Sequence, residues 1–171
     1  MRVVPALCSL LSMLLWANVG RASDAPCAWR NARWGMTEDE VVAAFPGEAV
    51  RASPDEIKKG AAPVRLEGCE IAGTRFQAQF FFYRSSRLTK IVFAPSSKRD
   101  ASRPLFERLA RMLTEEHGQP KIDMDQDMGV AGLRTAQKSW VAGDEEISLT
   151  YMYGTDEPYF GLVYDAPKPK K

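Results

Sequence analysis

The sequence predicts an α+β protein made of two tandem α-β-β-β units, whose antiparallel meander sheets share one core. In both halves of the chain a helix signature is followed by segments that alternate apolar and polar residues. Segment 80–93 also parallels segment 149–164 in composition and in the position of its turn. One helix over three strands buries little apolar surface alone, so we expect the two units to pack side by side or face to face.

Residues 1–22 have the pattern of a signal peptide. Arg2 precedes an uncharged apolar run over 3–19, and the small residues Gly20 and Ala22 precede the expected cleavage point. The alternative is an uncleaved N-terminal anchor. The run is barely long enough to cross a bilayer and no second run follows, so we expect no membrane span after cleavage. The predicted location is periplasmic or secreted.

The net charge and the number of cysteines indicate which partners and which cellular compartment to expect. Removal of Arg2 and Arg21 changes the formal net charge from +1 to −1, which gives no electrostatic reason to expect nucleic acid. The basic segment 167–171 is predicted to be a disordered tail. Cys27 and Cys69 remain after cleavage, and in an oxidising compartment such a pair predicts a disulfide bond rather than two free thiols.

The first unit is predicted over 23–98. Thr37 and Glu40 form a capping box that begins a helix, and Ser53 and Glu56 repeat that signature for a shorter one. A two-residue period then predicts three strands over 64–67, 76–83 and 88–94.

The second unit is predicted over 99–166. Ser102 is a suitable cap for a helix whose apolar residues recur at helical spacing, and Gly118 ends it. An acidic loop is expected over 123–129, followed by strands over 135–142, 147–153 and 159–165.

After the signal peptide, the order of a helix followed by a short meander occurs twice in the chain. This repeated order resembles the tandem units of β-lactamase-inhibitor-like proteins. It is also similar to the helix-plus-three-strand module of small outer-membrane assembly lipoproteins, although no acylated cysteine is present. Segment 35–41, Gly-Met-Thr followed by three residues and Val, is similar to an opening found in many uncharacterised bacterial exported proteins. The resemblance implies a binding or assembly role in the bacterial envelope, and it carries over no contact residue.

No catalytic, metal or cofactor site is predicted. His117 is the only histidine and falls in the last turn of the expected helix, where capping or solvent contact accounts for it. The alternating carboxylates of Asp123, Asp125 and Asp127 are reminiscent of a calcium loop, but Arg134 stands where the bidentate glutamate is needed. We therefore expect an acidic solvated loop there.

The aromatic residues are the remaining signal. Phe81 and Tyr83 alternate with Phe80 and Phe82, so that strand is apolar on both faces, and Trp140 lies in the second sheet. Either both sheet faces are buried, or an open face presents Phe81, Tyr83 and Trp140 to a partner. We expect a non-catalytic protein-binding or assembly/inhibitor protein of the envelope. A small-ligand or cation-binding periplasmic module is the alternative, and a hydrolase comes third.

Overall fold

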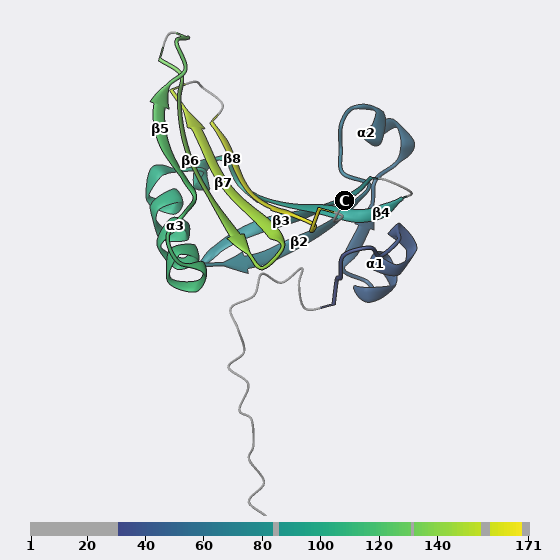
Figure 1. Ribbon diagram of the computed structural model, residues 1–171. Coiled ribbons are helices and arrows are strands. Elements are labelled where there is room, and N and C mark those ends of the chain that lie inside the picture. The colour runs from purple at the N-terminus through teal and green to yellow at the C-terminus, as the bar shows by residue number, and fades with distance from the viewer. Residues whose placement is uncertain (1–30, 84–85, 131, 155–157, 169–171) are drawn as a thin grey trace, which may run out of the picture.

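The structure is a computed structural model that describes residues 31–83, 86–130, 132–154 and 158–168 (Figure 1). The predicted signal peptide, Cys27 and the last residues of the predicted tail lie outside the described residues.

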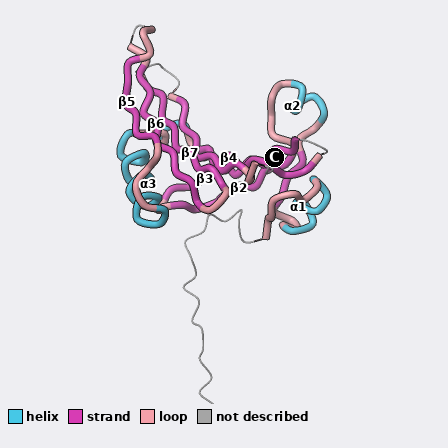
Figure 2. Tube along the Cα trace, in the orientation of Figure 1, coloured by secondary structure: helices cyan, strands magenta, loops and turns pink. Residues whose placement is uncertain are grey.

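An eight-stranded antiparallel sheet dominates the fold, in the order β1-β2-β3-β4-β8-β7-β6-β5 (Figures 1 and 2). The predicted α+β class is thereby confirmed, with strands outweighing helices. Strands β1 to β4 form one meander and β5 to β8 another, and the two join where β4 pairs with β8. The strands are β1 (Ala49–Arg51), β2 (Val64–Ile71), β3 (Thr74–Tyr83), β4 (Arg87–Pro95), β5 (Ile122–Asp127), β6 (Arg134–Ala142), β7 (Glu145–Tyr153) and β8 (Tyr159–Asp165).

The helices begin where the capping signatures predict. Thr37 caps α1 (Glu38–Ala44) and Ser53 caps α2 (Pro54–Lys58), each within a complete capping box. Ser102 caps α3 (Arg103–His117), after a short 3-10 turn at Lys98–Asp100. Gly118 ends α3 with a positive φ of 80°, a backbone conformation that glycine adopts without strain.

The two principal helices cover the same face of the sheet. Phe45, directly after α1, packs against Phe80 of β3, and Phe106 of α3 packs against Tyr151 of β7. Figure 1 shows the sheet bent, with α3 beside the β5–β8 part and α1 beside the β2–β4 part, both outside the bend. The face inside the bend has no described helix across it, and only α2 stands at its border.

Buried side chains from both meanders form a single hydrophobic cluster under α1 and α3. At the junction between the meanders, Phe93 of β4 meets Tyr164 of β8 with ring centroids 5.9 Å apart. Phe76 and Phe160 make a second contact across the same boundary at 6.4 Å. The core therefore runs through the junction instead of stopping at it.

Two strands differ from the sequence-based expectation. No strand was predicted over Ala49–Arg51, and this segment forms β1 at one edge of the sheet. The segment expected to be an acidic loop is largely strand β5, at the opposite edge. Of the two packing arrangements left open, the meanders lie side by side in one sheet.

At two positions the backbone geometry would be strained by any residue other than glycine. Gly68 has a φ of 71° at the irregularity between Leu66 and Cys69, where β2 carries an extra residue relative to β3. Gly154, at the end of β7, lies so close to the backbone of Gly132 that a side-chain carbon there would overlap the Gly132 carbonyl. This contact holds the end of the β5–β6 hairpin against the end of β7.

Candidate functional site: the open sheet face

We call the sheet surface opposite α1 and α3 the open face. The strand register aligns one row of its residues across all eight strands. Val50 and Ile122 stand at the two ends of that row, and Val92, Val163, Ser148 and Ser139 form its middle. In sheet order, the row consists of Val50, Arg65, Gln79, Val92, Val163, Ser148, Ser139 and Ile122.

Most of the exposed large apolar side chains of the described residues lie on the open face. Eight large hydrophobic residues of the described chain are exposed, and the register places five of them on this face. Tyr83 and Tyr159 are the most exposed of the five, at 54% and 50%. The five residues are spread over the face, from the edge strand β1 to the edge strand β5. The five residues are Val50, Tyr83, Ile122, Val141 and Tyr159.

The three aromatic residues predicted as partner contacts divide between the two faces. Phe81 and Tyr83 lie on the open face of β3 with their rings stacked, the centroids 6.4 Å apart. Trp140 lies on the helix-covered face of β6, only 1% exposed, and its Nε1 donates to the Gly118 carbonyl at 3.1 Å. The expectation for Trp140 was therefore wrong, because the ring is part of the core and its N–H group caps the end of α3.

Tyr159 is an open-face aromatic that the sequence did not single out. Its phenol group lies along β8 over Gly161, where an added side-chain carbon would come within 2.7 Å of the hydroxyl oxygen. The absence of a side chain at Gly161 therefore lets the Tyr159 ring rest on the sheet. The alternation of Tyr159, Phe160 and Gly161 in the sequence places Tyr159 and Gly161 on one face of the strand. It does not indicate which face of the sheet is open.

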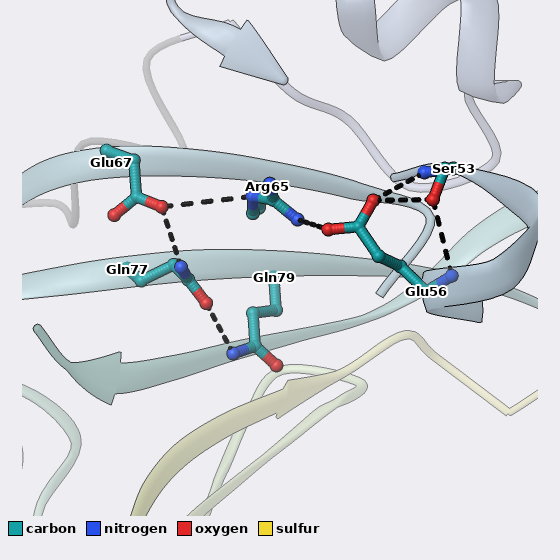
Figure 3. A network of polar contacts seen from close by, with 6 residues as sticks. All are labelled: Ser53, Glu56, Arg65, Glu67, Gln77 and Gln79. Carbon is teal, nitrogen blue, oxygen red and sulfur yellow. Dashed lines mark hydrogen bonds and ion pairs between the residues drawn. The ribbon is translucent and has the colours of Figure 1, made fainter. Parts of the chain in front are cut away.

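A polar network lies on the open face across β2 and β3 (Figure 3). Arg65 of β2 lies between Glu56 of α2 at 3.3 Å and Glu67 at 3.9 Å. The Gln77 amide donates to Glu67 and the Gln79 amide donates to Gln77, each at 2.7 Å. These contacts link side chains of α2, β2 and β3.

A second cross-strand row of the open face is charged. Lys90, Asp165 and Glu146 follow one another on β4, β8 and β7, so the two carboxylates stand directly opposite each other. Lys90 Nζ contacts Asp165 at 3.1 Å, and Lys168 Nζ contacts Glu146 at 3.3 Å. Phe81 and Val141 continue this row on either side of the charges.

Two hollows of the open face bear on its chemistry. The larger of these two, of about 490 Å³, lies where β4 begins and β8 ends, and it is lined by Tyr83, Thr89, Glu146, Asp165, Ala166, Pro167 and Lys168. The smaller, of about 350 Å³, has mainly apolar walls that include Phe81, Val92 and Tyr159. Together they place one charged and one apolar depression on the same surface.

The alternating carboxylates of β5 are used in ion pairs and a turn. Asp123 pairs with Lys138, and Asp125 receives hydrogen bonds from Arg103 at 2.6 Å and from Tyr153 at 3.3 Å. Asp127 accepts the Gly129 N–H at 2.8 Å. The solvated-loop interpretation was thus wrong in structure, because these side chains tie an edge strand to α3 and to the adjoining strands.

The described carboxylates with a lowered pKa act in structural contacts. Backbone hydrogen bonds at the helix caps lower the pKa of Glu40 and of Glu56, and the Arg103 hydrogen bond lowers the pKa of Asp125. His117 lies in the last turn of α3, 3.7 Å from Glu116. Within the described residues, no three His, Cys, Asp or Glu side chains group as a metal site requires.

Cys69 lies on β2, facing the helix-covered core, and it is 1% exposed. Its predicted partner Cys27 is outside the described residues, so the disulfide stays a prediction. In the part of the chain that the structure describes, no helix has the length and apolar character to cross a membrane.

No protein-family model, curated protein sequence or solved structure matches this chain. The function proposed next therefore rests on the residues and geometry of the open face.

Proposed function

We propose that this chain is an exported, non-catalytic protein of the bacterial envelope that binds another protein on its open face. The observation that carries the proposal is that five of the eight exposed large hydrophobic residues of the described chain lie on that face. Apolar and aromatic side chains that lose their water on contact supply much of the free energy of association.

The shape of the open face supports binding to a protein. Small side chains such as Val163 and Ser148 form its middle, while Tyr83 and Tyr159 stand exposed. Tyrosine contributes a large contact area with few rotatable bonds, which makes it a favourable anchor. The polar network around Arg65 lies on the same face, between Val50 of β1 and Val92 of β4, and adds hydrogen-bonding groups to the apolar ones.

A finer proposal concerns the origin of the sheet. We infer that the two halves are related units, because β1-β2-β3-β4 and β5-β6-β7-β8 follow the same meander order and meet through their last strands. Each meander has a helix on the same face, α1 in one half and α3 in the other. The two units would then contain four strands each, with the short β1 corresponding to β5. This arrangement supports the resemblance to β-lactamase-inhibitor-like proteins, which remains a proposal.

A small-ligand-binding module is the second candidate, favoured by the hollow of about 490 Å³ on the same face. That volume is in the range of small-molecule sites. We favour a protein partner because the exposed apolar side chains extend from Val50 on β1 to Ile122 on β5, far beyond either hollow.

Site-specific photo-crosslinking in the producing bacterium tests the proposal. A photoreactive amino acid replaces Tyr83 or Tyr159 on the open face, and Arg111 on the outer surface of α3 provides the matched control. We expect the two open-face positions to give the same crosslinked protein and the control position to give none. Crosslinks of equal yield from all three positions, or none at all, would contradict binding at the open face.

A further inference from the structure

The larger hollow has an unusual charge arrangement. Asp165 and Glu146 are direct cross-strand neighbours, and like charges in this position repel each other unless cations compensate. Lys90 of β4 provides one cation from within the sheet, 3.1 Å from Asp165. The arrangement therefore has a place for a second cation beside Glu146.

In the structure the chain's own Lys168 occupies that place. Its Nζ lies 3.3 Å from Glu146, but the Lys168 side chain is 88% exposed. Ion pairs this exposed to water contribute little to stability, about 0–1 kcal/mol. An incoming cation can replace Lys168 at small cost.

The walls of the hollow suit the remainder of a long basic side chain. Tyr83 presents an aromatic ring, and Ala166 and Pro167 add apolar surface. Thr89 also lines the hollow, and its Oγ1 is shielded from solvent without a hydrogen-bond partner among the described residues. Aromatic rings and carboxylates together are the usual surroundings of a bound lysine or arginine.

We propose that this hollow receives a lysine or arginine side chain of the protein that docks on the open face. Lys168 holds its place in the free protein. This inference rests on the proposed function and adds a chemical requirement on the partner: an exposed basic residue that reaches Glu146 and Asp165. Val141 and Phe81 in the same cross-strand row contact the apolar surface around that residue.

The chemistry of the hollow can be tested without knowing the partner. NMR titration of the mature protein uses Nα-acetyl-lysine amide as the probe and Nα-acetyl-norleucine amide as its neutral counterpart. We expect the lysine probe to shift the backbone signals of Thr89, Glu146 and Asp165, and the neutral probe to leave them in place. The Lys168→Gln variant should bind the lysine probe about two- to fivefold more tightly, because the competing lysine is gone.

Further variants separate recognition from general charge effects. Glu146→Gln should lose most of the response, whereas Glu115→Gln on α3, which removes the same charge elsewhere, should retain it. Equal shifts with both probes, or an unchanged affinity in Lys168→Gln, would overturn the proposal. A dimer that forms in the wild-type protein and disappears in Lys168→Gln would also overturn it, since the occupant would then be a second copy of this chain.

Crosslinking from Tyr159 distinguishes the failure of this inference from the failure of the proposed function. If Glu146→Gln reduces the crosslink severalfold, the partner uses the hollow as proposed. If the crosslink persists at full yield in Glu146→Gln, a protein docks on the open face but the hollow does not select its basic residue. If no crosslink forms in the wild-type protein while the NMR response follows Glu146, the hollow binds cations and the docking proposal fails.

Discussion

The side chain of Asp125, on the edge strand β5, makes several polar contacts. Its carboxylate accepts from Arg103 of α3 and from Tyr153 of β7, and it lies 3.4 Å from Arg134 of β6. An edge strand exposes unpaired backbone groups, and charged side chains discourage other chains from pairing with it. On β5 the same charges also attach the strand to its neighbours.

Substitution of Asp125 should therefore weaken folding in a pH-dependent way. At pH 7 we expect Asp125→Asn to lower the free energy of unfolding by about 1 kcal/mol, as for exposed ion-pair networks. The Arg103 hydrogen bond lowers the pKa of Asp125 in the folded state. Its stabilisation is consequently complete above the ordinary carboxyl pKa of about 3.9 and is lost as the pH falls through the lowered folded-state pKa.

Urea unfolding of both proteins between pH 7 and pH 2 provides the measurement. The difference between the wild-type protein and Asp125→Asn should be constant at neutral pH and disappear at the acid end. Glu115→Gln, an exposed carboxylate on α3, serves as the control and should change stability little. A difference between wild type and Asp125→Asn that persists unchanged at pH 2 would show that the carboxylate charge is not the cause.

The same residues show why the sequence predicted some features and not others. A capping box is a contact within four residues, so Thr37 with Glu40 was readable from spacing alone. The role of Asp125 depends on Arg103 and Arg134, which approach it only in the folded chain. Alternating aspartates without those partners are indistinguishable from a solvated loop.

At the scale of elements, the central strands were predictable and the edge strands were not. In β3 the alternation of Phe76, Ala78 and Phe80 with polar residues predicted the strand, and the structure shows that these three residues lie on its buried face. The β1 strand contains three residues, too few for a two-residue period to be recognised. The partner role expected for Trp140 was wrong for a related reason, because β6 has buried side chains on both of its faces, Ser139 and Trp140 among them.

The predicted disulfide bond would link the N-terminal segment to strand β2. Cys69 is buried beside Phe76, the residue that pairs with it on β3. A bridge to Cys27 would close a loop of just over forty residues, which corresponds to about 4 kcal/mol on the chain-entropy model. That contribution is large compared with the usual stability of a small domain.

Purification of the exported protein from its own cells tests both export and the bridge. We expect the mature chain to begin at Ser23 and, when unfolded without reductant, to contain no thiol that reacts with a thiol reagent. Cys27→Ala and Cys69→Ala should each expose one thiol and lower the free energy of unfolding. Two reactive thiols in the wild-type protein would contradict the disulfide, and an N-terminus at Met1 would contradict cleavage.

In the whole molecule, the side-by-side arrangement of the two meanders leaves one face of the sheet uncovered by the described helices. When two meanders join edge to edge, helices on the same face cover one continuous layer, and the opposite face stays available along the entire sheet. Here α1 and α3 take the covered side, and the open face spans all eight strands. The sequence left this choice open because both arrangements bury the same alternating residues.

The continuous core predicts that the two halves unfold together. Phe93 with Tyr164 and Phe76 with Phe160 link β3 and β4 to β8, so separating the halves would expose aromatic surface on both. Native-state hydrogen exchange in increasing denaturant measures this directly. The slowest-exchanging amide hydrogens of β3 and of β7 should have the same opening free energy. That free energy should decrease with denaturant concentration at the same slope in both strands.

A junction variant makes the test more specific. Phe93→Ala should cost about 3–5 kcal/mol, as for buried phenylalanines in general, and lower the opening free energy in β3 and β7 by the same amount. Val130→Ala at the exposed end of the β5–β6 hairpin is the apolar control and should leave both values within about 0.5 kcal/mol. If Phe93→Ala weakened β3 alone, the halves would be independent domains. Two related halves would then share a sheet without sharing a folding transition, and the open face would form from parts of unequal stability.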